Sequence, residues 1–144
     1  MDTSTLNDMI EVLDDGRKFY EEAAAEVDRA DLKALFTRMA RAKEAIGNDL
    51  RTVVAARGEK PPEGGSWAGS VRQAYADLRV MLSKDKTYAY IAELEGFEDR
   101  IMQAFRDAAA KSSDATVNSL AERYMSEVSR DHAHMSTLEH LHAA

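Results

Sequence analysis

The sequence predicts an all-α fold: four long helices arranged as two antiparallel hairpins, with a long crossover joining the hairpins. Apolar residues recur at every third or fourth position along four long segments, which is the period of one face of an α-helix. The only two prolines, Pro61 and Pro62, stand together, so the rest of the chain is free of the strongest helix breaker. We expect one domain over residues 1–144, with helices over about residues 5–28, 31–57, 67–82, 86–111 and 114–141.

The first two predicted helices form a hairpin. Thr5 is the expected cap of the first helix, because its side-chain oxygen can accept a hydrogen bond from a free backbone N–H. The break at residues 28–31 is too short for anything but an antiparallel turn, and Asp31 is the expected cap of the second helix. The apolar faces of this hairpin consist of Leu6, Met9, Ile10, Leu13, Tyr20, Ala24, Val27, Leu32, Leu35, Phe36, Met39, Ile46, Leu50, Val53 and Val54.

A long connection follows the first hairpin. Residues 58–66 combine glycines with both prolines, a shorter amphipathic helix is predicted over residues 67–82, and residues 83–85 form a second break. Trp67 and Tyr75 are expected to anchor the short helix on the bundle. An up-down bundle would need only a short loop here, whereas this connection is long enough to run back along the bundle.

The last two predicted helices form the second hairpin. Residues 112–114 provide its turn and the cap of the final helix. The apolar faces of this hairpin consist of Tyr88, Ile91, Leu94, Ile101, Met102, Phe105, Val117, Leu120, Tyr124, Val128, Met135, Leu138 and Leu141.

Three glycines, Gly16, Gly47 and Gly96, interrupt helices near their middles. Each costs about 1 kcal/mol relative to alanine, so a compensating reason is needed. We expect close contacts between helices, and a widened turn around a bound ligand is the alternative.

Composition excludes several classes of protein. The chain has no cysteine, which excludes disulfides, thiolate zinc sites and iron–sulfur clusters and fits a reducing compartment. Its net charge of −7 makes it a poor binder of nucleic acid. No apolar run approaches the ~20 residues of a membrane span, and the N-terminus lacks the pattern of a signal peptide. We therefore expect a cytoplasmic protein with neither a nucleic acid nor a membrane as partner.

Several segments resemble an uncharacterised bacterial family of ferritin-like bundles, a domain of unknown function. The resemblance spans nearly the whole chain and is carried by residues 6–16, 19–24, 35–36, 58–69 and 95–99. It implies a ferritin-like four-helix bundle and assigns no activity. The wider ferritin and rubrerythrin relatives hold two iron ions with one Glu from each of two helices and a Glu-x-x-His pair from each of the other two.

The first hairpin departs from that ligand set. The second helix has no histidine, because Gly47 stands where a Glu-x-x-His pair beginning at Glu44 would need one. Arg17 and Tyr20 occupy the middle of the first helix, and we expect no carboxylate squarely on its apolar seam. Two of the four expected contributions are therefore missing.

The second hairpin keeps part of the ligand set. The apolar seams place Glu98 and Asp131 inward, with Glu95 on a neighbouring face and His134 one turn beyond Asp131. If the turn is centred near Ser113, antiparallel pairing puts Glu95 level with Asp131. Glu95, Glu98, Asp131 and His134 are therefore the candidate metal ligands, for iron or manganese, with Glu21 or Glu22 as further candidates. The other three histidines, His132, His140 and His142, are expected to face solvent.

The competing interpretation is a polar core without metal, and it is the one we favour. An unpaired buried carboxylate costs several kcal/mol, so the acidic residues need partners. Lys43, Arg38 and Arg41 of the second helix can supply them.

The sequence leaves open whether the protein is an enzyme. It contains no Gly-rich phosphate loop, Gly-x-Ser-x-Gly elbow or His-Glu-x-x-His motif. The leading hypothesis is a non-enzymatic or vestigial bundle that acts as an interaction or stress-associated protein and forms homo-oligomers. The alternative is a metal-binding protein or di-iron oxidoreductase of the ferritin–rubrerythrin type, and a third is a binder of small molecules in a core cavity.

Overall fold

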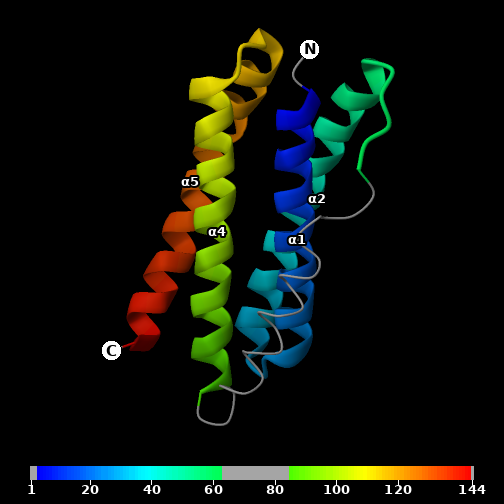
Figure 1. Cartoon of the computed structure of the whole chain (residues 1–144). Helices are drawn as coiled ribbons and strands as arrows, with labels where there is room; N and C mark the ends of the chain where they lie inside the picture. Colours follow the sequence, from blue (N-terminus) through cyan, green and yellow to red (C-terminus); the bar gives the residue numbers. More distant parts are fainter. Residues whose placement is uncertain (1–2, 63–84, 144) are drawn as a thin grey trace.

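The computed structural model describes residues 3–62 and 85–143, and these residues form four helices and no strand. They are α1 (Thr3–Glu26), α2 (Ala30–Ala56), α4 (Lys86–Lys111) and α5 (Ala115–Ala143), shown in Figure 1. Each begins and ends within two residues of a helix that the apolar period predicts. The short helix predicted over residues 67–82, with Trp67 and Tyr75, lies outside the described residues. No helix in the described part of the chain is long and apolar enough to cross a membrane.

The helix directions follow from two ion pairs between helix ends. Lys86 Nζ lies 3.1 Å from Glu26 Oε2, so α4 begins beside the end of α1. Arg57 lies 2.9 Å from Asp114, so α2 ends beside the start of α5. Consequently α1 runs antiparallel to α2 and to α4, while α2 and α4 run in the same direction (Figure 1).

The helix ends show where capping agrees with expectation and where it does not. Asp85 caps α4 by accepting a hydrogen bond of 3.0 Å from the backbone N–H of Tyr88, and Asp114 accepts one from Thr116 at the start of α5. The predicted caps Thr5 and Asp31 are both wrong, because α1 already includes Thr3 and α2 begins at Ala30. Asp31 lies in the first turn instead and pairs with Arg29. Its negative charge still interacts favourably with the helix dipole there.

Gly58 ends α2. Its φ of 79° lies in the left-handed region that favours glycine. Its N–H donates to the carbonyl of Ala55, and the next N–H, of Glu59, donates to the carbonyl of Val54. These bonds satisfy carbonyls that the end of a helix leaves free.

The buried core consists of two apolar clusters stacked along the bundle. The first, near the α1–α2 turn, is rich in aromatic residues, and the rings of Phe19 and Phe97 lie 5.0 Å apart. The second, near the α4–α5 turn, is mostly aliphatic. Its members are Leu6, Met9, Ile10, Val12, Leu13, Ile46, Leu50, Val54, Ile101, Phe105, Ala108, Val117, Ala121, Tyr124 and Val128.

Helix α1 is the most enclosed element, since every residue from Val12 to Gly16 is buried. A Cβ atom added at Gly16 would lie 3.0 Å from Ile101 Cδ1, so this glycine allows α1 and α4 to approach closely. At Gly47 an added Cβ would lie 3.3 Å from a guanidinium nitrogen of Arg51. At Gly96 no described atom lies within 4 Å, and nothing in the described structure explains this glycine.

Candidate functional site

A charged group lies in the middle of the bundle, between the two apolar clusters. On α2, Lys43 stands between Met39 of the first cluster and Ile46 of the second. Glu98 holds the corresponding place on α4, and Asp131 the corresponding place on α5. The side chains of Lys43 and Glu98 are 0% exposed, and that of Asp131 is 17% exposed. Of these three side chains, Asp131 on α5 is therefore the one that reaches the surface.

The Lys43 ammonium is the centre of this group. Its Nζ lies 2.8 Å from Glu98 Oε1 and 3.1 Å from Oε2, and 2.6 Å from Asp131 Oδ2. The hydroxyl of Tyr20, on α1, donates a hydrogen bond of 2.8 Å to Glu98 Oε1. Every helix of the described structure thus contributes one side chain, and we call these four residues the central network.

Burial and charge act against each other in the central network. Burial is the largest influence on Glu98 and raises the pKa of its carboxyl, although the Lys43 ammonium and the Tyr20 hydroxyl oppose that rise. For Lys43, burial lowers the pKa, but Glu98 and Asp131 together outweigh it and hold the pKa above its ordinary value. Burial and the adjacent Glu98 also raise the pKa of Tyr20 well above its ordinary value. At neutral pH the network therefore holds a protonated lysine and a neutral tyrosine, whose hydroxyl donates a hydrogen bond to Glu98.

The structure brings two of the four candidate metal ligands together. Glu98 and Asp131 converge on one point, and the atom at that point is Lys43 Nζ. Glu95 turns to another face of α4, where its Oε1 lies 3.0 Å from His132 Nε2. His134 is exposed.

No group of three or more His, Asp or Glu side chains in the described residues is arranged to hold a metal ion. Glu21 and Glu22, the further candidates, are both exposed.

His132, which was expected to face solvent, lies against Glu95 and Asp99 of α4. It is about three-quarters buried and lies 3.6 Å from Asp99. Residues two apart on a helix point in different directions, so His132 and His134 cannot both face α4. The antiparallel register was the signal that could have found it, because it places Glu95 level with residue 131 and its neighbour.

Two other buried polar features were missed in the sequence. Lys43 appeared only as one of three candidate partners, although its place on the apolar seam between Met39 and Ile46 marks it as inward-facing. Helix α1 was expected to carry no carboxylate on its seam, but Asp14 and Asp15 are both buried. Their burial was missed because a single buried face was assumed, whereas α1 is enclosed on several sides.

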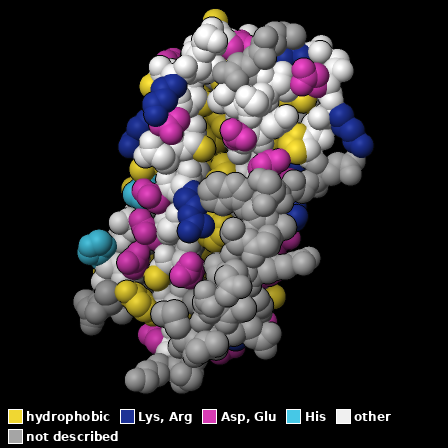
Figure 2. Space-filling model, viewed as in Figure 1, with side chains coloured by type: hydrophobic (Ala, Val, Ile, Leu, Met, Phe, Trp, Pro, Cys, Tyr) yellow, Lys and Arg dark blue, Asp and Glu magenta, His cyan; other side chains and the backbone are white. Residues whose placement is uncertain are grey.

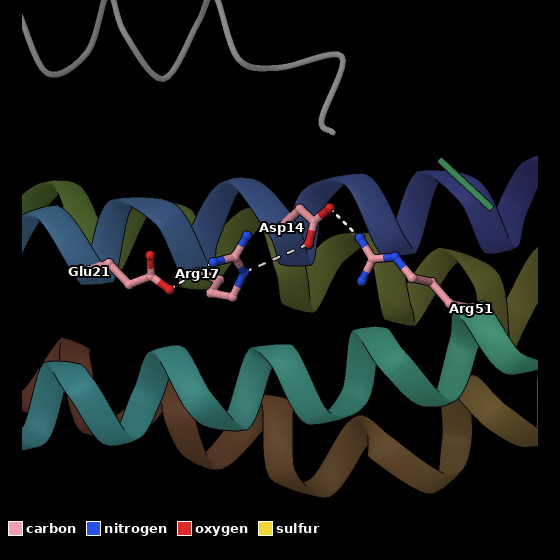
Figure 3. A network of polar contacts seen from close by, with 4 residues as sticks. All are labelled: Asp14, Arg17, Glu21 and Arg51. Atoms are coloured by element: carbon pink, nitrogen blue, oxygen red, sulfur yellow. Dashed lines mark hydrogen bonds and ion pairs between the residues drawn. The ribbon is translucent and has the colours of Figure 1, made fainter. Parts of the chain in front are cut away.

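The two acidic side chains of α1 differ in their surroundings. Asp14 pairs with Arg51 of α2, as Figure 3 shows. Neither carboxylate oxygen of Asp15 has a hydrogen-bond partner in the described structure. Burial, followed by the nearby charges of Lys18, Asp14 and Glu11, changes the pKa of Asp15 from 3.8 to about 6, with only Lys18 acting to lower it.

Comparison with known proteins identifies one family. No curated protein matches the chain, and neither does any solved structure. The family described as Domain of unknown function (DUF2383) matches residues 1–111, which include Tyr20, Lys43 and Glu98 and end with α4. Since this match covers well over half of the sequence, the chain belongs to the DUF2383 family of domains of unknown function.

Proposed function

We propose that this protein is a non-enzymatic bundle of ferritin-like topology in which the Lys43 ammonium occupies the central place of a metal ion. The observation that carries the proposal is the contact of Lys43 Nζ with Glu98 at 2.8 Å and with Asp131 at 2.6 Å. A lysine ammonium neutralises carboxylates and donates hydrogen bonds to them, but it offers no open coordination position. A bundle with such a centre keeps the shape of a ferritin relative and loses its iron chemistry.

The support for ferritin-like topology is the parallel course of α2 and α4. The chain leaves α2 at one end of the bundle and enters α4 at the other. A crossover of this kind between two antiparallel hairpins is typical of ferritin-like folds.

Because the central network is almost closed to solvent, we expect the protein to act through its surface. The chain carries a net charge of −7, and on the face shown in Figure 2 acidic side chains are spread among basic ones without gathering into one patch. We propose a role as an interaction or stress-associated protein in the cytoplasm. The absence of cysteine supports the cytoplasmic location, because it fits a reducing compartment.

Self-association is part of the proposal. Leu141, near the end of α5, is 69% exposed, and it is the one large apolar side chain of the described residues to be so exposed. We expect Leu141→Ser to weaken a dimer that sedimentation detects at micromolar concentration, whereas Ala133→Ser, at an exposed position of the same helix, leaves it unchanged. A clean 16.0 kDa monomer of the unaltered protein would remove this part of the proposal.

The alternative function is metal binding or di-iron oxidation. Its support is the convergence of Glu98 and Asp131, with Glu95 one turn away on α4. The donor set fits poorly, because Lys43 would have to withdraw its ammonium and His134 would have to turn inward. We therefore rank this function second.

Metal analysis separates the two functions. Protein purified without chelator, then incubated with ferrous iron under anaerobic conditions, is compared with Glu98→Ala and with Glu122→Ala, a control at an exposed position of α5. We expect no stoichiometric iron or manganese in any of the three proteins. Stoichiometric metal that disappears in Glu98→Ala and persists in Glu122→Ala would overturn the proposal and establish the alternative.

A further inference from the structure

A second polar site lies outside the core, in the groove between α1 and α2. It is a pocket of about 570 Å³, which is in the size range of small-ligand sites. Arg17 lines it from α1 and Arg51 from α2, and the chain beyond α2 closes one end with Lys60 and Pro61. The pocket shares no residue with the central network.

The two arginines are held in place by carboxylates. Asp14 is buried, and Arg51 reaches across from α2 to pair with it (Figure 3). Arg17 Nη1 donates a hydrogen bond of 2.7 Å to Glu21, and its Nε lies 3.9 Å from Asp14 on the side away from Arg51 (Figure 3). Side chains fixed by such supporting contacts lose little freedom when they bind a ligand.

Gly47 contributes to this arrangement. The Arg51 guanidinium folds back over it, and an added Cβ would come within 3.3 Å of that guanidinium. Gly47 therefore has a structural explanation here, because the absence of a side chain leaves room for Arg51 to reach Asp14.

The arginines keep donors to spare. A guanidinium carries several N–H groups in a planar fork, and in the described structure each of these two uses one in a hydrogen bond. The charged residues lining the pocket are three basic side chains and two acidic ones, Asp14 and Glu44. The Arg51–Asp14 pair cancels itself, so the lining carries a small excess of one positive charge in a protein whose net charge is −7.

We propose that this pocket binds a small phosphate-bearing ligand, with Arg17 and Arg51 as the recognising residues. Planar guanidinium forks match the oxygens of a phosphate, and two of them lining one pocket suit a dianion. This proposal is independent of the role of Lys43 and stands or falls separately.

The test is a phosphate titration at constant ionic strength, with chloride replacing phosphate in the reference. Binding is followed by calorimetry and by thermal unfolding of the whole chain. We expect saturable binding of inorganic phosphate, weakened roughly tenfold in Arg17→Gln because one charged fork is lost. Arg130→Gln, at an exposed position of α5, is the matched control and should bind as the unaltered protein does.

Arg17→Gln is chosen over a change at Arg51 because Arg17 is partly exposed and its removal leaves the Asp14–Arg51 pair intact. A shift of equal size with chloride would overturn the proposal. So would equal phosphate affinity in the unaltered protein and in Arg17→Gln.

Discussion

Replacing Lys43 by methionine tests the central network by removing its cation while keeping a side chain of similar length. In the described structure Lys43 is the cation in contact with Glu98, which is itself 0% exposed. Breaking a buried ion pair by removing one partner costs about 3–5 kcal/mol, because the remaining charge is left without compensation. Glu98 keeps the Tyr20 hydrogen bond, and Asp131 can turn to water, so Glu98 accounts for most of the cost.

We therefore expect Lys43→Met to lose about 3–5 kcal/mol of unfolding free energy at pH 7, which lowers Tm by roughly 10 °C or more in a domain of this size. Urea unfolding followed by circular dichroism measures the loss. Lys111→Met, whose side chain is 76% exposed, is the matched control and should stay within about 0.5 kcal/mol of the unaltered protein.

The charges of Lys43 and Glu98 should also be coupled. Lys43→Met combined with Glu98→Gln removes both charges, and the double variant should regain most of the stability lost by Lys43→Met alone. The deficit of the single variant should shrink as the pH falls, because the pKa of Glu98 is already raised and its protonation ends the unpaired charge. A folded Lys43→Met within about 1 kcal/mol of the unaltered protein would show that the ammonium does not stabilise the carboxylates as we infer.

Three further substitutions give sharp expectations. Tyr20→Phe removes the hydroxyl that donates to Glu98 and should cost about 1.5–3 kcal/mol in urea unfolding, and no loss would mean that this hydrogen bond is absent in solution. For Asp15, folding raises the pKa from 3.8 to about 6, so the penalty of its buried charge is complete above pH 6 and vanishes below about pH 4. Asp15→Asn should accordingly stabilise the protein by up to about 3 kcal/mol at pH 7.5 and hardly at all at pH 3.5, and a gain independent of pH would contradict the stated cause. Gly47→Ala gains about 1 kcal/mol of helix propensity but crowds Arg51, so phosphate affinity should fall in calorimetry while stability does not; unchanged affinity would separate Gly47 from the pocket.

The helices of this protein are predictable because their apolar period is strong and their breaks are short. The turn at residues 28–31 admits only a hairpin, and Asp114 caps α5 where its position indicates. The start of α2 was misplaced because a short polar break holds two acidic residues and either can look like a cap.

The centre of the bundle was only partly predictable. Helical period places Glu98 and Asp131 inward, and the structure has both of them there. Period also marks Lys43 as inward-facing, but it cannot decide whether Lys43 or an arginine of the same helix reaches both carboxylates. The choice depends on which side chain stands level with both carboxylates, and that is a property of the packed bundle.

Burial on α1 was the least predictable feature. A seam drawn through the apolar residues leaves Asp14 and Asp15 on the polar side, and a helix with one buried face would expose them. Close approach to α4 at Gly16 and pairing with α2 through Arg51 enclose further sides of α1. Helix enclosure is a tertiary effect that one sequence does not reveal.

The most direct test of a lysine at the centre of this bundle is nitrogen-15 NMR of the lysine ammonium groups. We expect one ammonium signal that exchanges slowly with water, is absent from Lys43→Met, and persists beyond pH 10.5 because the pKa of Lys43 is raised above that ordinary value. If all lysine ammonium groups exchange freely and titrate together near pH 10.5, Lys43 is not the buried cation of the central network.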